Sequence, residues 1–480
     1  MKWNQLYICI LVILTSVACG QELITFPDTQ YEAYSEPVIK GRRFKHRDII
    51  PLIDKLPTDL FEKKVLGQSI EGRDIYQVKV GKGPTKILLW SQMHGNEPTA
   101  TMAIFDLFNF FATQDSLDPL RNYILQNTTL YFIPMLNPDG AERYQRRNAL
   151  QVDLNRDALR LQCPESKILK AAVDDLAPHW GFNLHDQNRY SSAGKTHHPA
   201  SMSFLAPAYD EAKSWNQTRT ESMQLIVAMN AILQNYLPNK IGRYSDEFEP
   251  RAFGDNIQKW GTRTILIETG ALRGDLEKQH LRKLNFIALL GAFQNIINHK
   301  FRKHSLEAYL RIPLNKGFLH DVIIREATMM KNGVPYILDI GFRHGEVNTK
   351  DHRGFQPHYS ISDIGDLHNY FAYQELDASG LIIKPGKVYP KTFQHLSQLS
   401  DAQMTHLLKD GYTTVRVQEM VTRIAKLKCP LNIIGASSSP ATNIDLGTDP
   451  PLILTKDDEA KYAVINGRIF DLAKEHLLEK

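Results

Sequence analysis

Short apolar runs alternate with helical patterns between about residue 35 and residue 300. The runs of strand length are Lys86–Trp90 (KILLW), Thr129–Met135 (TLYFIPM) and Thr264–Ile267 (TILI). Apolar residues recur at helical spacing in Pro98–Phe111, Ser222–Tyr236 and Leu281–His299. Alternation of continuously apolar strands with helices predicts an α/β fold whose sheet is covered on both faces.

The pattern changes after about residue 305. Asp321–Ile324, Tyr336–Ile340, Gly380–Ile383 and Tyr462–Ile469 are short strand-like runs separated by Gly, Asn and Asp, with one helical piece over Ser400–Asp410. The sequence therefore predicts two domains, an α/β domain over residues 35–304 and a smaller β-rich domain over residues 305–480.

The amino terminus has the pattern of an export signal. Lys2 precedes the apolar run Leu6–Val17, which is shorter than the roughly 20 residues that span a bilayer. We therefore expect residues 1–20 to be a signal peptide, with no transmembrane span in the mature chain. Ser16-Val17-Ala18 before Cys19 is similar to a bacterial lipoprotein box, so a lipid anchor at Cys19 and simple cleavage stay as alternatives. The expected location is periplasmic, outer-membrane-anchored or extracellular.

Composition excludes several classes of protein. The 57 Lys and Arg against 53 Asp and Glu give a net charge of +4 over 480 residues, too little for a nucleic-acid-binding surface. Beyond Cys19 the only cysteines are Cys163 and Cys429, so no disulfide framework is expected.

His94 and Glu97 form the first candidate metal-binding pair. A His and a Glu three residues apart can place two ligand atoms on one side of a strand-to-helix bend. The spacing alone is weak, because His304–Glu307 and His476–Glu479 repeat it in expected surface helices. Only the first pair follows a buried strand and precedes a helix, the position where α/β proteins place their sites.

A catalytic zinc site needs a third protein ligand besides water. His185 ends the apolar stretch Gly181–Leu184 and is the preferred candidate. His179, His197 and His198 stay as competitors.

Glu268 is the candidate general base. It ends the apolar strand Ile265–Ile267, where low dielectric would raise the pKa of a carboxyl toward the value that proton transfer requires. The competing interpretation is a buried salt bridge.

A cationic cluster follows the turn signal Asn137–Gly140. It contains Arg143, Arg146, Arg147 and the dipeptide Asn155-Arg156. Arginine forks bind carboxylates through two hydrogen bonds, so these groups could hold a free α-carboxylate and polarise a carbonyl. Arg143 and Arg147 are equally consistent with a solvated surface.

In this order the motifs resemble the zinc metallocarboxypeptidases of the carboxypeptidase A/B type. The motifs are His94…Glu97, Asn137–Gly140, Arg146, Asp153–Arg156, His185 and Glu268, with Ser69–Arg73 similar to the family's upstream segment. The resemblance covers roughly residues 60–300. It implies a mixed, mostly parallel eight-stranded sheet flanked by helices.

The resemblance also implies roles for individual residues. His94, Glu97 and His185 would bind one Zn²⁺ per chain, Glu268 would be the base and then the acid, and Arg146 would stabilise the oxyanion. The substrate would be a peptide whose free C-terminal carboxylate is bound by Asn155 and Arg156. Arg73 would line the subsite before it, and Tyr244 would be the tyrosine that caps the substrate. In the loop Gly242–Asn256, which contains Tyr244, Asp255 would favour a basic C-terminal side chain of the substrate, and Phe253 would favour an apolar one.

The C-terminal part has a second resemblance, to the β-sandwich that precedes the barrel of amidohydrolases. It is carried by Asp339–Phe342, Asp377–Gly380, Pro385-Gly386 and Asn466–Ile469. The expected HxH pair is absent, since residues 387–395 are KVYPKTFQH, so we expect a non-catalytic module.

The leading hypothesis is thus a zinc metallocarboxypeptidase. The alternatives are an amidase acting on cell-wall peptides or other carboxylate-bearing amides, and an inactive peptidase-like protein that binds peptides.

Overall fold

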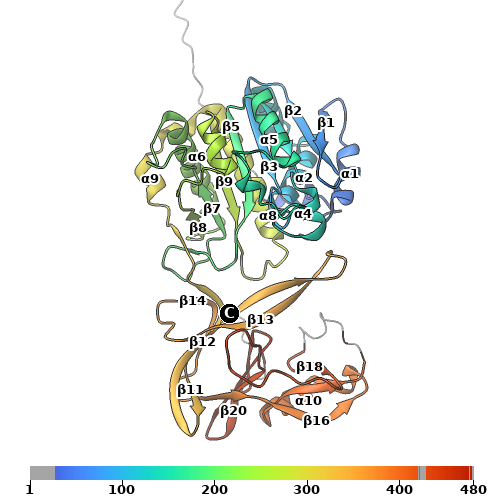
Figure 1. Ribbon diagram of the computed structural model, residues 1–480, viewed down its shortest axis with the longest axis vertical. Helices are drawn as coiled ribbons and strands as arrows, with labels where there is room; N and C mark the ends of the chain where they lie inside the picture. Colours follow the sequence, from blue (N-terminus) through green and yellow to red (C-terminus); the bar gives the residue numbers. More distant parts are fainter. Residues whose placement is uncertain (1–27, 420, 422–428, 475, 478–480) are drawn as a thin grey trace, which may run out of the picture.

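The computed structural model describes residues 28–419, 421, 429–474 and 476–477. Figure 1 shows an α/β part built around one large sheet and, below it, a β-rich part formed by the C-terminal third of the chain. The predicted export signal and Cys19 lie outside the described residues. Within the described ranges, none of the helices combines the length and the apolar composition that crossing a membrane requires.

The α/β part contains an eight-stranded sheet in the order β1-β2-β4-β3-β5-β9-β7-β8. The central strands β4, β3, β5 and β9 are parallel, and antiparallel pairs lie toward both edges. The strands are β1 (Phe61–Gln68), β2 (Asp74–Gly81), β3 (Thr85–Ser91), β4 (Thr128–Ile133), β5 (Trp180–Asp186), β7 (Met202–Leu205), β8 (Ile241–Arg243) and β9 (Arg263–Thr269). This mixed α/β sheet confirms the predicted fold class.

Helices cover both faces of this sheet. They are η1 (Asp28–Ala33), α1 (His46–Asp54), α2 (Thr99–Ala112), α3 (Asp118–Asn127), α4 (Pro138–Arg143), η2 (Leu154–Arg156), α5 (Pro164–Leu176), α6 (Gln217–Leu233), α7 (Phe253–Lys259), α8 (Gln279–Asn298), η3 (Lys300–Lys303) and α9 (Leu306–Leu310). Along β3, Ile87 and Leu89 join the core under α2, α6 and α8, while Leu88 and Trp90 join the core under α5 and α7. Successive side chains point to opposite faces, so both faces are apolar and the strand is a continuous apolar run.

The predicted strands and long helices of this part are confirmed, with ends shifted by a few residues. The predicted turn over Asn137–Gly140 is wrong, because these residues begin helix α4. The Asn137 side chain accepts a hydrogen bond from the Gly140 N–H (2.9 Å), and Pro138 occupies the first helical position, which is a helix N-terminus signal that also occurs in turns.

The β-rich part contains a nine-stranded sheet and a three-stranded parallel sheet. Its strands are β11 (Leu319–Lys331), β12 (Val334–Asn348), β13 (Phe355–Gly365), β14 (Phe371–Asp377), β15 (Ile382–Pro385), β16 (Lys387–Phe393), β17 (Tyr412–Val417), β18 (Asn432–Gly435), β19 (Leu452–Lys456), β20 (Glu459–Ile465), β21 (Arg468–Asp471) and β22 (His476–Leu477). It also contains η4 (Leu396–Gln398) and α10 (Asp401–Lys409), and a short pair of β6 (Ser192–Ala193) with β10 (Asn315–Lys316) joins the two parts.

Two features of this part differ from the expected short strands. The runs Asp321–Ile324 and Tyr336–Ile340 lie inside the long strands β11 and β12, because both strands continue past their apolar core into more polar residues. In β12 these include His344 and Glu346, which contact the α/β part. Tyr462–Ile469 is a hairpin of β20 and β21 rather than one run. The domain boundary near residue 305 and the amidohydrolase-like character of the module stay predictions.

Candidate metal centre

The candidate site lies at the carboxyl ends of three adjacent parallel strands. His94 and Glu97 occupy the loop between β3 and α2, His185 is near the end of β5, and Glu268 is near the end of β9. His185 and Glu268 are register partners across β5 and β9. Residues far apart in the sequence therefore meet at one edge of the sheet, as expected for an α/β fold.

Close packing holds the loop that carries His94 and Glu97. A Cβ added to Gly95 would lie 2.0 Å from the Gly140 carbonyl carbon, so only glycine fits between this loop and α4. The Asn137 side chain also donates to the Met93 carbonyl oxygen (3.2 Å). The segment Asn137–Gly140 thus positions the candidate ligands.

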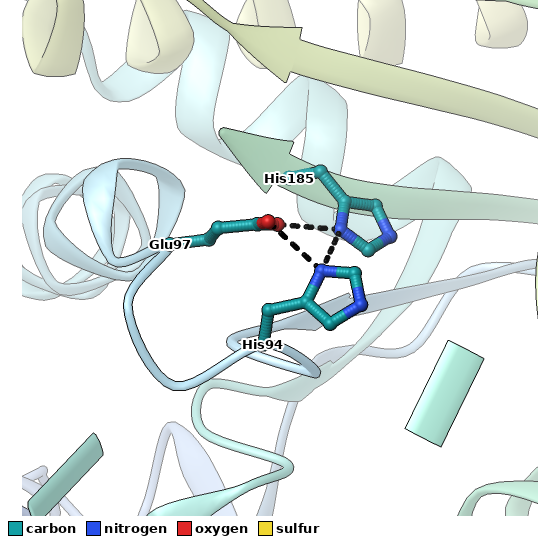
Figure 2. A group of neighbouring side chains, drawn as sticks. All are labelled: His94, Glu97 and His185. Carbon is teal, nitrogen blue, oxygen red and sulfur yellow. Dashed lines mark hydrogen bonds and ion pairs between the residues drawn. The ribbon is translucent and has the colours of Figure 1, made fainter. Parts of the chain in front are cut away.

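His94, Glu97 and His185 point their ligand atoms at one another (Figure 2). His185 Nδ1 lies 2.7 Å from Glu97 Oε2, His94 Nδ1 lies 2.9 Å from Glu97 Oε1, and the two Nδ1 atoms are 3.1 Å apart. All three residues are buried, and their ligand atoms lie within 4.8 Å of one another. Two imidazoles and one carboxylate are a donor set that catalytic zinc sites use.

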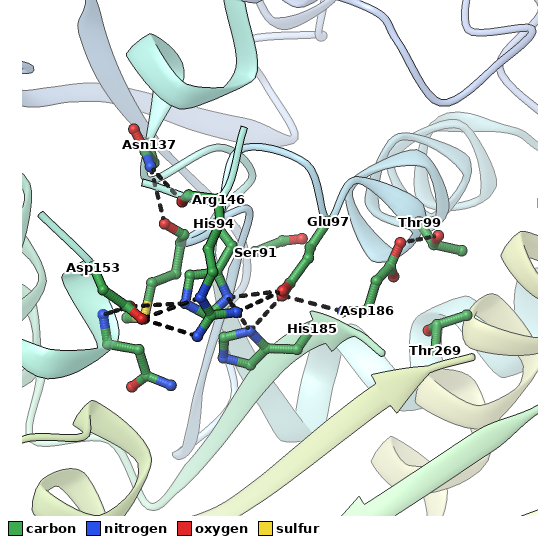
Figure 3. A network of polar contacts seen from close by, with 12 residues as sticks. Ser91, His94, Glu97, Thr99, Asn137, Arg146, Asp153, His185, Asp186 and Thr269 are labelled. Carbon is green, nitrogen blue, oxygen red and sulfur yellow. Dashed lines mark hydrogen bonds and ion pairs between the residues drawn. The ribbon is translucent and has the colours of Figure 1, made fainter. Parts of the chain in front are cut away.

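Asp153 completes the fit to a metal ion. Its Oδ1 lies 3.0 Å from His94 Nε2, on the side of the ring that faces away from the other two side chains (Figure 3). When Nε2 carries the proton and donates to this carboxylate, Nδ1 presents its lone pair to the centre. Asp153 is thus a further candidate residue of the site, to which the sequence analysis gave no role of its own, although it stands two residues before Asn155.

The charges of Glu97 and His185 suit ligation. Burial raises the pKa of Glu97, but the His94 and His185 rings outweigh burial and hold the pKa well below its usual range. Burial lowers the pKa of His185. Burial also opposes protonation of His94, but the carboxylates of Glu97 and Asp153 leave its pKa raised. An ionised Glu97 and a neutral His185 are the forms that bind metals.

Arg146 lies beside this group. Its Nη1 is 3.2 Å from Glu97 Oε1, and its Nη2 is 3.0 Å from Asp153 Oδ2. The side chain is 43% exposed and lines a cavity of about 640 Å³ that also contains the three candidate ligands. Its guanidinium is therefore accessible to a molecule bound in this cavity.

The Glu268 carboxyl faces the same cavity. Burial raises the pKa of Glu268 well above its ordinary value, and the Glu97 and Asp186 carboxylates raise it further. Among the residues that the structure describes, no cation forms an ion pair with Glu268, which argues against the salt-bridge interpretation. Lys278 pairs instead with Asp186 (3.1 Å).

Asn155, Arg156 and Tyr244 line the cavity as well. The Asn155 side-chain oxygen accepts from the Phe253 N–H (2.9 Å), and Arg156 Nε lies 3.1 Å from Glu249 Oε2. Burial raises the pKa of Tyr244, with further contributions from Glu268 and Glu97. Tyr244 therefore lines the same cavity as the candidate base.

Arg73 does not join this group. Its Nη1 pairs with Asp139 Oδ1 and Glu71 Oε2, both at 2.6 Å, and it does not line the cavity. The ion pair with Asp139 instead connects the segment Ser69–Arg73 to helix α4.

The competing residues lie elsewhere. His179 Nδ1 accepts a hydrogen bond from the Lys86 N–H (3.0 Å), and the rings of His197 and His198 contact each other. His304 immediately precedes the N-cap residue of α9. Within the described residues, only His94, Glu97 and His185 form a group of three potential ligands.

Residues 49–233 match the family model described as zinc carboxypeptidase. Carboxypeptidase SOL1 of Arabidopsis thaliana is 30% identical over 127 residues, which are 23% of this chain and 26% of that protein. Carboxypeptidase D of Mus musculus is 29% identical over 136 residues, 25% of this chain and 10% of that protein. The chain thus spans about a quarter or less of these relatives.

Among solved structures, the chain is similar to a metallo-carboxypeptidase from Burkholderia cenocepacia. The TM-score is 0.44 with 17% sequence identity, over 53% of this chain and 69% of that chain.

Proposed function

We propose that this protein is a zinc-dependent metallocarboxypeptidase that hydrolyses the C-terminal peptide bond of peptides, because residues 49–233 match the zinc carboxypeptidase family model. The observation that carries the proposal is the convergence of His94, Glu97 and His185, with the carboxyl of Glu268 in the same cavity and free of any ion pair among the described residues. The retention of every one of these groups favours an active enzyme over an inactive binding protein.

The candidate metal ligands and Glu268 have different roles in the proposed hydrolysis. A Zn²⁺ held by His94, Glu97 and His185 would polarise the scissile carbonyl and acidify the attacking water. Glu268 takes one proton from this water and delivers it to the leaving amine, while the hydroxyl goes to the carbonyl carbon. The products are a shortened peptide and a free amino acid.

Arginines provide the charge complementarity. Arg146 lies beside Glu97, where its guanidinium stabilises negative charge that develops on the carbonyl oxygen. Arg156, with Asn155, binds the C-terminal carboxylate, which takes the place of the Glu249 carboxylate on the Arg156 fork. Tyr244 covers the bound residue. Arg73 acts only indirectly, through α4.

Release of C-terminal residues tests this function. Purified protein, incubated with a peptide library, should release one C-terminal residue at a time, and a chelator should stop the release. Internal cleavage, or cleavage that survives full removal of the metal, would contradict the proposal.

Asp255 favours a basic C-terminal residue. It lines the cavity, whereas Phe253 is fully buried in the core and does not. Burial raises the pKa of Asp255 to about 6. Below that pH the carboxyl is mostly neutral; above it the carboxylate can pair with a Lys or Arg side chain, which stays cationic throughout.

We expect the ratio of kcat/KM for C-terminal Lys against C-terminal Leu to rise as pH increases through about 6. In Asp255→Asn the ratio should fall by at least about tenfold at pH 8, because a charge-assisted hydrogen bond contributes about 1.5–3 kcal/mol. The ratio compares two substrates on one enzyme, so any loss of zinc at low pH cancels. If the Lys-to-Leu ratio of kcat/KM does not change with pH in the wild-type protein or in Asp255→Asn, Asp255 does not determine the substrate preference.

The export signal predicted from residues 1–20 would place this activity outside the cytoplasm. A more specific version of this proposal is that a lipid attached to Cys19 anchors the exported protein to a membrane. Mass spectrometry of the mature amino terminus distinguishes the lipidated protein from the cleaved one.

A further inference from the structure

The long hairpin of β12 and β13 lies against the α/β part (Figure 1). Its first contact is with the loop that follows β5. Arg189 Nη2 pairs with Asp321 Oδ1 of β11 (2.8 Å), and Arg189 Nη1 lies 3.2 Å from His344 Nδ1 of β12. The His344 N–H donates to Asp321 Oδ2 (2.6 Å), and the Tyr190 hydroxyl lies 2.6 Å from the His344 carbonyl oxygen.

A second contact holds the far end of the same hairpin. The Glu346 carboxylate pairs with Arg42 and Arg43, each at 2.7 Å. The Arg43 guanidinium lies 4.2 Å from the centre of the Phe355 ring and 4.0 Å from that of Tyr144. The side chains of Arg42 and Arg43 are 8% and 3% exposed, so this ion-pair cluster is largely shielded from solvent.

At these two contacts, β12 contributes to the wall of the cavity that contains the candidate metal centre. His344 and Glu346 line the same cavity as His94, Glu97 and His185. Arg189 follows the candidate ligand His185 by four residues, so their Cα atoms are at most about 14 Å apart, the span of about four extended residues. Because Arg189 contacts His344, the wall formed by β12 lies near the metal centre.

The carboxylate-binding end and the β12 wall have different neighbours. Arg156 Nε lies 3.1 Å from Glu249 Oε2. The wall residue Glu346 pairs instead with Arg42 (2.7 Å), whose Nη1 lies 3.3 Å from the Tyr144 hydroxyl.

The metal centre shares one cavity with both ends. Asp186 follows the ligand His185, and its N–H donates to Glu97 Oε2 (3.2 Å). Arg156, the three candidate ligands and Glu346 all line this cavity. A peptide held by its carboxylate at Arg156 therefore occupies a cavity that β12 also lines.

We propose that the β-rich domain limits the length of the substrate, so that the enzyme acts on short peptides and not on the C-termini of long polypeptides. The inference rests on the proposed carboxypeptidase function. The cavity volume of about 640 Å³ falls in the range of about 300–1,000 Å³ that is typical of small-ligand pockets. In this proposal the hairpin, held by ion pairs at both contacts, obstructs the upstream residues of a longer chain.

A nested series of peptides tests the limit. The peptides share their C-terminal residues and are extended at the amino end by Gly and Ser, from two to about twelve residues, which spans about 40 Å when extended. With the wild-type protein we expect kcat/KM to fall at least tenfold between the four-residue and the longest peptide.

A double variant connects the limit to the hairpin. Glu346→Ala with Asn348→Ala removes the contacts to Arg42, Arg43 and the Arg143 carbonyl. It should raise the ratio of long-peptide to short-peptide kcat/KM at least tenfold. The matched control is Glu459→Ala in β20, whose carboxylate is exposed and pairs only with Lys461 among the described residues; it should leave the ratio unchanged.

The outcomes separate the two proposals. Equal wild-type rates on all lengths would overturn the length limit and leave the carboxypeptidase function standing, and this result does not depend on whether the double variant folds. A length limit that the folded double variant retains would overturn the role of the hairpin. No C-terminal release from any peptide would overturn the proposed function and the length limit with it.

Discussion

Replacing Glu268 by Gln is expected to lower kcat by about 10²–10⁴-fold, the usual contribution of a general acid–base group. Gln keeps the shape of the side chain but can neither accept the proton of the attacking water nor deliver one to the leaving amine. Glu268 lies outside the group of candidate ligands, so zinc content should stay at about one ion per chain. Steady-state kinetics with metal analysis of the same preparation measure both.

The matched control is Glu62→Gln in β1, whose carboxylate is exposed and pairs with Lys79. It should retain wild-type kcat. Turnover of Glu268→Gln within a few-fold of wild type would show that another group transfers the proton.

His185→Ala should lose both zinc and activity. The variant leaves two protein ligands where a catalytic zinc site uses three. Loss of a group that merely supports a ligand costs about 10–100-fold in metal affinity, so we expect loss of a ligand to weaken zinc binding by more than about 100-fold. Metal analysis after dialysis measures the zinc, and circular dichroism verifies that the buried substitution leaves the fold intact.

Two variants complete this experiment. His197→Ala changes an exposed competitor histidine and should keep full zinc occupancy. Asp153→Asn should lower zinc affinity by about 10–100-fold, less than His185→Ala, because it weakens the hydrogen bond that orients His94 without removing a ligand. Full zinc occupancy in His185→Ala would discard the third ligand and, with it, the metal centre described above.

Part of this site could be predicted because its chemistry is encoded locally. His94, His185 and Glu268 each stand at or just beyond the end of a continuously apolar run, and such runs become buried strands. In an α/β fold the carboxyl ends of parallel strands share one edge, so polar residues there are candidates for a common site. The fold class and the likeness to zinc carboxypeptidases follow from the same local patterns and their order.

Other features required the tertiary contacts. The segment Asn137–Gly140 has the composition of a turn, but it begins a helix that packs on the Gly95 loop. Asp153 belongs to the motif Asp153–Arg156, but the motif does not reveal its contact with His94, which lies 3.0 Å away in space and 59 residues away in the sequence. Arg73 could not be placed from its motif, because its partner Asp139 comes from another element.

The amino-acid sequence by itself determined the buried strands, the helices between them and the types of reactive group at the strand ends. These depend on periodicity and on neighbours along the chain. Only the tertiary structure decided which histidine joins His94 and Glu97, and that His344 and Glu346 of the β-rich part line the catalytic cavity. The reason is physical: such contacts join residues about 90 to 250 positions apart, and their geometry is set by how strands and domains pack, which no local pattern of residues specifies.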